Sequence, residues 1–152
     1  MFDAFTLIKW VHVLLAIIAV GFNASYGIWL ARAAKEPAHQ AHVLRGIKTL
    51  DDRFANPAFV LLLVTGLIMV AISWPRITDL WIILALILYV ILVAVGGAAF
   101  TPTLRKQIRV IESEGPQSAE FQRLAKRGQA VGIFLGVVVI AIVFLMVIKP
   151  TL

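Results

Sequence analysis

Cysteine is absent from this chain of 152 residues, which excludes disulfide bonds and thiolate metal sites. Charge is also scarce, because 14% of the residues are charged and 61% are hydrophobic. A soluble domain has about a quarter of its residues charged and about half apolar, and its helices carry charged outer faces. The long apolar stretches of this chain have no such faces. The low charge content therefore excludes an ordinary soluble domain and indicates a membrane protein.

Several catalytic and transport templates are missing as well. Acidic residues do not occur in the interior of the apolar stretches, which argues against a proton or sodium transporter of the usual design. The chain has no glycine-rich phosphate loop, no paired intramembrane carboxylates, and no serine or cysteine nucleophile beside a base. Phosphoryl transfer and hydrolysis by these templates are therefore not indicated.

Four apolar runs are long enough to cross a bilayer, which requires about 20 mostly apolar residues. They cover roughly residues 7–31, 54–74, 77–100 and 129–148, and the mean hydropathy of the chain is +0.96. The N-terminus lacks the basic segment of a cleavable signal peptide, so we expect the first run to be retained. The sequence predicts an all-α fold: a polytopic membrane protein built as a four-transmembrane-helix antiparallel bundle, in a single membrane domain over residues 1–152.

Basic residues gather in two of the connecting segments. Eleven of the 14 lysines and arginines lie in residues 32–53 and 105–127, where acidic residues are interspersed among them. By the positive-inside rule, the loops 32–53 and 101–128 are cytoplasmic and both termini face outward. The first loop has the periodicity of an interfacial amphipathic helix that runs into the second span. The second loop should form helical extensions that project beyond the membrane around the turn at Gly115 and Pro116. We expect a bacterial inner (plasma) membrane protein, N-out and C-out, whose partner is the lipid bilayer and not nucleic acid.

One face of the first apolar run carries a stripe of polar and small side chains, which we call the polar seam. Heptad spacing places these residues on one side of a helix: Lys9, His12, Ala16, Ala19, Asn23 and Tyr26. The other faces are largely aliphatic. We expect the polar seam to meet another helix, with Asn23 and Tyr26 as polar links between helices. Tyr89, at the middle of the third run, should likewise find a partner inside the protein.

His12 is the only histidine inside a predicted span, and an ionisable side chain in that position is by default a candidate functional site. At 1.5 Å per residue, it lies about 7–8 Å inside the outer boundary, and Met69 of the second run lies at a similar depth. Lys9, Met146 and Lys149 lie toward the same outer end. The sequence thus predicts a cofactor site at His12, Met69, Lys9 and Lys149, or a metal site at His12, Met69 and Met146.

Three interpretations of this cluster remain open. Imidazole is the usual axial ligand of haem iron and methionine is a common second ligand, while the lysines suit the propionates. Copper(I) favours histidine and methionine donors in the same way. Alternatively, His12 is a neutral histidine that hydrogen-bonds across the bundle. A bis-histidine haem of the cytochrome b type is excluded, because no second histidine lies inside a span.

The fourth run carries Gly128, Gly132 and Gly136 at intervals of four residues. This small-xxx-small pattern lets helices approach closely, and we expect it to serve helix packing. The same face could support a homodimer or attachment to a larger membrane complex. A non-catalytic accessory or assembly subunit is therefore a further interpretation of the chain.

An ordered set of motifs resembles the HemJ-type protoporphyrinogen oxidases of bacteria. These motifs are Lys9-x-x-His12, Gly21, Arg32, Arg53, Pro57, Thr65-Gly66-Leu67, Trp81 and Met146-Val-Ile-Lys149-Pro150. The resemblance extends to CopD-like copper-resistance membrane domains, and it is nearest to a family of four-span membrane proteins of unassigned function that end in Lys-Pro. It implies a four-helix membrane bundle with His12 as a haem ligand.

The chain departs from those oxidases after Trp81. HemJ-type enzymes carry a polar pair containing a lysine there, whereas this chain continues Ile82 and Ile83. If the protein is an enzyme, the resemblance implies a protoporphyrinogen-oxidase-like oxidoreductase, but the lysine associated with that reaction is missing. Binding of haem b or a porphyrin, with copper as the alternative, is the function that the sequence predicts.

Overall fold

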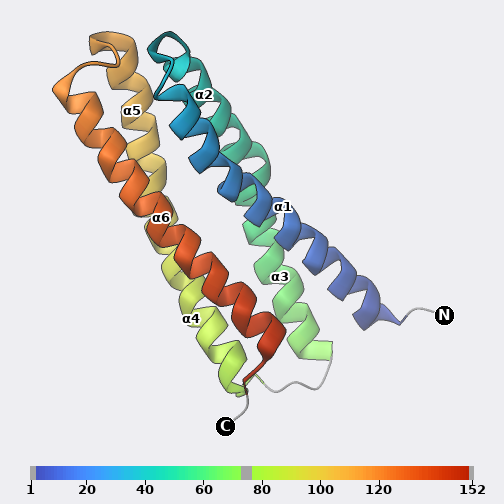
Figure 1. Ribbon diagram of the computed structural model, residues 1–152. Helices are drawn as coiled ribbons and strands as arrows, with labels where there is room; N and C mark the ends of the chain where they lie inside the picture. Colours follow the sequence, from blue (N-terminus) through green and yellow to red (C-terminus); the bar gives the residue numbers. More distant parts are fainter. Residues whose placement is uncertain (1–2, 73–76, 151–152) are drawn as a thin grey trace.

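A computed structural model of the protein describes residues 3–72 and 77–150, and the regular structure in these ranges is entirely helical (Figure 1). The elements are α1 (Ala4–Ala33), η1 (Pro37–His39), α2 (Gln40–Leu50), η2 (Asp51–Ala55), α3 (Asn56–Ile72), α4 (Leu80–Val95), η3 (Gly96–Phe100), α5 (Thr101–Glu114) and α6 (Ala119–Ile148). In this part of the chain, four continuous helical stretches are long and apolar enough to cross a membrane. The predicted all-α, four-span fold is confirmed, although residues 73 and 74, at the end of the second predicted span, lie outside the described ranges.

The four long stretches form two antiparallel hairpins (Figure 1). In the first hairpin, α1 packs along α3, which continues α2 through η2. In the second hairpin, α6 packs along α4 and α5, which are joined through η3. Each hairpin has one uninterrupted helix and one helix that contains a π-helical segment, η2 or η3. The uninterrupted helix comes first in the first hairpin and last in the second. Both π-helical segments lie where a polar helical extension meets an apolar span.

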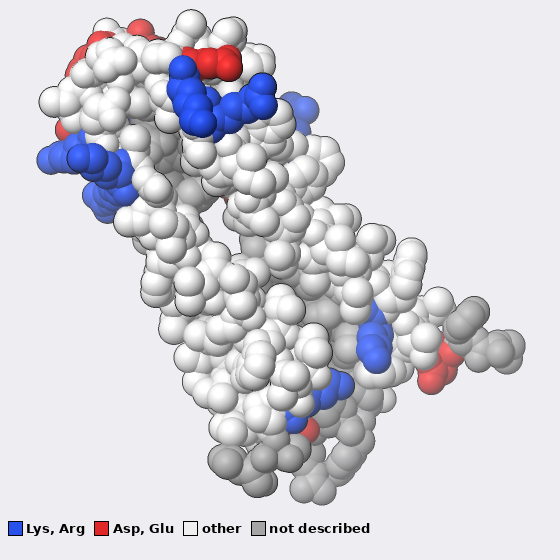
Figure 2. Space-filling model, viewed as in Figure 1, with Lys and Arg blue, Asp and Glu red and all other residues white. Residues whose placement is uncertain are grey.

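Charged side chains gather at one end of the molecule, which we call the basic end (Figure 2). It consists of α2, α5, the first turns of α6 and the connections beside them, and it contains both predicted basic loops. These loops are largely helical, as their periodicity predicts. Along the spans, by contrast, large apolar side chains are exposed, with Ile17 at 64% and Ile140 at 70%. Such a surface suits lipid and would be a liability in water.

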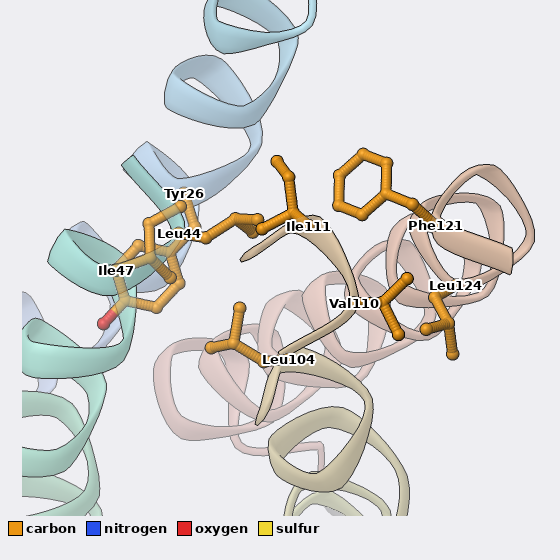
Figure 3. Close-up of a cluster of buried hydrophobic side chains, with 8 residues drawn as sticks. All are labelled: Tyr26, Leu44, Ile47, Leu104, Val110, Ile111, Phe121 and Leu124. Carbon is orange, nitrogen blue, oxygen red and sulfur yellow. The ribbon is translucent and has the colours of Figure 1, made fainter. Parts of the chain in front are cut away.

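The hairpins are joined at the basic end by a cluster of buried apolar side chains (Figure 3). Its members come from both hairpins: Tyr26, Leu44, Ile47, Leu104, Val110, Ile111, Phe121 and Leu124. The apolar faces of the amphipathic helices α2 and α5 point inward to form it. An ion pair of 2.7 Å between Arg45 Nη1 and Glu112 Oε1 crosses its rim. Burial of these side chains from water is the main force holding the two hairpins together there.

A second contact joins the hairpins in the middle of the spans. Leu92, Leu135, Val138 and Val139 form a buried cluster in the second hairpin, and Val20 and Phe59 of the first hairpin pack against it. The Tyr89 hydroxyl donates a hydrogen bond of 2.6 Å to the Phe59 carbonyl oxygen. The expectation that Tyr89 finds a partner inside the protein is thus confirmed. This bond also fixes α4 against α3 at a level where no water competes.

Only one of the three glycines at four-residue spacing is closely packed within the chain. A Cβ atom on Gly128 would lie 2.7 Å from Gln107 Nε2, and that buried amide donates a hydrogen bond of 2.7 Å to the Leu124 carbonyl oxygen. Gly132 makes ordinary contact with Phe100, and Gly136 faces open space. Close packing therefore explains Gly128 but not Gly136. The homodimer face proposed from Gly128 to Gly136 is covered by α5 at its Gly128 end.

This difference gives a matched pair of variants. Gly128→Ala is expected to lower the thermal midpoint of the protein in detergent by several degrees. The new methyl group displaces the Gln107 amide from its acceptor, and a buried donor that loses its acceptor costs about 1–3 kcal/mol. Gly136→Ala should leave the midpoint unchanged or raise it slightly, because alanine favours the helix. Equal midpoints for the two variants would contradict this account of Gly128.

Candidate functional site

His12 lies on α1 and faces α3. Its Nδ1 atom is 2.8 Å from the Thr65 hydroxyl oxygen, and the imidazole is half-buried between the two helices. Gly66 leaves room for the ring, since a Cβ atom there would lie 3.3 Å from His12 Cε1. A larger side chain than glycine would press on the imidazole. Thr65 and Gly66 together therefore set the position of the ring.

The surroundings of the Thr65 hydroxyl favour one of the two protonation forms of a neutral imidazole. The Thr65 hydroxyl donates to the Leu61 carbonyl oxygen at 2.8 Å, one turn earlier on α3, with the Leu62 carbonyl at 3.2 Å. A hydroxyl has a single hydrogen, so toward His12 it acts as an acceptor. When the hydroxyl donates to either carbonyl, the proton of a neutral His12 is assigned to Nδ1, and Nε2 keeps its lone pair. Metal-ligating histidines have the same arrangement, with one nitrogen held by a hydrogen bond and the other available.

The polar seam meets α3 and η2 along its whole length. His12 opposite Thr65 and Phe22 beside Phe54, with ring centroids 5.5 Å apart, define an antiparallel register. This register places Ala19 opposite Ala58, and both are almost completely buried, at 0% and 4% exposed. Small residues at that point let the two backbones approach closely. The predicted face of the first helix is therefore the face that packs.

The expected polar links at the other end of the seam are wrong. The Asn23 amide donates a hydrogen bond of 2.9 Å to the Ala19 carbonyl oxygen of its own helix, and not to a neighbouring helix. The Tyr26 hydroxyl is buried and has no hydrogen-bond partner among the described residues. Tyr26 instead contributes its ring to the apolar cluster at the basic end (Figure 3). Between helices, Tyr26 thus supplies apolar packing and not a hydrogen bond.

The remaining predicted site residues are divided between the two hairpins. Lys9 is exposed on α1 about one turn from His12, and Met69 is half-buried on α3 one turn from Thr65. Met146 is 37% exposed on α6. Lys149 ends α6 in a left-handed conformation, and its ammonium lies 5.4 Å from the centre of the Trp81 ring. Lys9, His12 and Met69 thus belong to the first hairpin, whereas Met146 and Lys149 belong to the second.

Sequence reasoning did not identify Thr65 as the partner of His12. The available signal was a hydroxyl residue on the second run, at a depth close to that of His12, followed by glycine. A group of three or more His, Asp or Glu side chains able to hold a metal ion is not found among residues 3–72 and 77–150. The donors at the α1–α3 seam are therefore one imidazole and, a turn away, one thioether.

The lipid-facing surface and the four apolar helices define an α-helical integral membrane protein. The chain belongs to the family described as predicted integral membrane protein (DUF2269), whose family model matches residues 6–150. That range contains the whole polar seam and both basic segments. No match was found among curated proteins or among solved structures.

The proton on His12 can be observed directly. In the His39→Gln, His42→Gln variant, His12 is the only histidine, so its imidazole nitrogen resonances are resolved from all others. We expect Nδ1 to be protonated and Nε2 to be unprotonated at neutral pH. Adding Thr65→Val removes the acceptor, and the proton should then redistribute toward Nε2. A proton on Nε2 in the presence of Thr65 would contradict the assignment made from the Thr65 hydroxyl.

Proposed function

We propose that the protein binds haem b or a related porphyrin within the bilayer, with Nε2 of His12 as axial ligand. The observation that carries this proposal is the orientation of His12 by Thr65, which leaves the lone pair of Nε2 available for iron. A neutral imidazole held at Nδ1 can present its second nitrogen to a metal, as metal-ligating histidines do.

The neighbouring residues fit the same ligand. The thioether of Met69 is a candidate second ligand, because Met69 lies one turn from Thr65 on the helix that holds His12 in place. The ammonium of Lys9 is exposed one turn along α1 and suits a propionate. Lys149 is a weaker candidate for a propionate, since it already contacts Trp81. When bound, haem would supply one-electron redox chemistry or act as cargo.

In this proposal the protein orients the His12 ring so that Nε2 can bind the iron. Under the same proposal, Thr65 accepts a hydrogen bond from the protonated Nδ1, and Gly66 leaves room for the ring. The resemblance to HemJ-type protoporphyrinogen oxidases supports the proposal through His12 and Lys9. Ile82 and Ile83 follow Trp81 where those oxidases have a lysine-containing polar pair, so we propose binding and not porphyrinogen oxidation. The charge distribution supports a place in the bacterial inner membrane, with the His12 end outward.

A visible absorption spectrum and a metal analysis of the same purified sample test the proposal. Protein produced with ample haem should show a Soret band that His12→Ala abolishes. Met69→Leu should retain some of the band but shift it, because only the second ligand changes. His42→Ala is the control, since His42 is exposed at the basic end and should leave the spectrum unchanged.

Three outcomes overturn the haem proposal. A sample without a Soret band but with stoichiometric copper, lost in His12→Ala and in Met69→Leu, would assign the site to copper(I). A sample that holds neither haem nor copper would leave His12 as a helix-linking residue. Retention of the Soret band in His12→Ala would place any haem elsewhere on the chain.

A further inference from the structure

A cavity of about 370 Å³ opens at the basic end of the second hairpin, far along the chain from His12. Its inner wall is formed by the small or apolar residues Ala98, Ala99 and Pro102, where η3 passes into α5. Its rim is formed by Lys106 of α5 and by Arg123 and Arg127 of α6. A cavity of this volume is within the usual size range of small-ligand sites. The inner wall, which we call the apolar floor, and the cationic rim together suit a ligand that is both amphiphilic and anionic.

The helices around the cavity are held by buried contacts. Gln107 is 5% exposed, and its side-chain amide donates a hydrogen bond to the Leu124 carbonyl oxygen. This hydrogen bond joins α5 to α6 beside the rim residues. Gly128 makes this approach possible, because any side chain there would meet the Gln107 amide. The cavity floor lies in the π-helical segment η3, whose widened turn is a feature often found at functional sites. The helices on the two sides of the cavity are therefore packed directly against each other.

The rim carries more positive than negative charge. Glu120 is the only carboxylate paired with it among the described residues, at 3.0 Å from Lys106 Nζ and 3.2 Å from Arg123 Nη2. Arg127 makes no ion pair within this part of the chain. Three cations and one carboxylate leave a net charge of +2. An anion that enters the cavity meets Arg127 without first displacing another partner.

The cavity lies where the apolar span ends. Ala98 and Ala99 belong to the third apolar run, which ends at about residue 100. Lys106 follows Ala98 by eight residues, which is about 12 Å along a helix at 1.5 Å per residue. The cavity thus spans the distance from the hydrocarbon to the headgroup level of a bilayer. A soluble anion would use the rim alone, whereas a phospholipid would use both the rim and the floor.

We propose that this cavity binds an anionic phospholipid, with its phosphate between Lys106, Arg123 and Arg127 and its glycerol region against Ala98 and Ala99. Basic cavities between transmembrane helices are suited to anionic headgroups. Arginine forks bind phosphate oxygens through two parallel hydrogen bonds, and two of the three rim residues are arginines. The site is independent of His12 and of any haem, and it goes beyond the function proposed above.

Binding can be measured with purified protein in neutral detergent, titrated with short-chain phosphatidylglycerol and followed by the shift in thermal midpoint. Short-chain phosphatidylcholine and inorganic phosphate are the two comparison ligands. We expect phosphatidylglycerol to stabilise the protein more than either of them. Arg127→Gln should weaken its affinity about fivefold, which corresponds to about 1 kcal/mol for each basic residue near an anionic surface.

Lys126→Gln is the matched control. Lys126 is adjacent to Arg127, exposed and equally charged, but it does not line the cavity. Its substitution should change the affinity less than twofold. Glu120→Gln should tighten binding, because it releases Lys106 and Arg123 from their carboxylate. This gain cannot arise from misfolding, so it keeps the proposal testable even if Arg127→Gln folds poorly.

The proposal is overturned by any of three results. If Arg127→Gln and Lys126→Gln lowered the affinity for phosphatidylglycerol equally, the lipid would be responding to the overall charge of the basic end. Equal stabilisation by phosphatidylcholine would remove the role of the anionic headgroup. Equal stabilisation by inorganic phosphate would show an anion site that does not use the apolar floor. Retained binding in His12→Ala is expected, so failure of the haem proposal does not affect this one.

Discussion

The hydrogen bond between His12 and Thr65 determines the organisation of the first hairpin. Inside a bilayer, a polar side chain has no water to bind, so a partner within the protein lowers the cost of its burial. His12 finds Thr65 on α3, and this contact sets the register that brings Ala19 opposite Ala58 and Phe22 beside Phe54. The same requirement is met by Tyr89, which reaches the Phe59 carbonyl across the hairpins. Asn23 meets it locally, by bonding to its own helix.

The number and nature of the spans could be predicted from the sequence, because hydropathy and length decide them. The face of α1 that packs could also be predicted, since the polar seam differs in composition from the lipid-facing sides. The helical character of α2 and α5 followed from their periodicity, and the extension of α5 beyond its span was expected. The expectation for α2 was an interfacial helix, whereas the structure continues it into α3 through η2. These features depend on local composition or on helical spacing, and a single chain contains that information.

The grouping of the site residues could not be predicted in the same way. Depth along a span follows from counting residues, and His12, Met69, Met146 and Lys149 do lie toward one end of their spans. Which helices are neighbours at that depth depends on how the hairpins pair, and depth does not specify this. The structure places Met146 and Lys149 on the second hairpin, with Lys149 over Trp81. Thr65 was overlooked for the same reason, because its role appears only when α1 and α3 are paired.

The small residues of the chain have different physical roles, which a shared spacing conceals. Gly66 gives space to an imidazole, Gly128 gives space to a buried amide, and Gly136 borders neither. The first two lie beside the two candidate sites, at opposite ends of different hairpins. Between these sites lie the Leu92 cluster and the bond from Tyr89 to Phe59, which join the hairpins in the middle. Because the α1–α3 seam and the α5–α6 cavity share no residue, each site depends on the packing within its own hairpin.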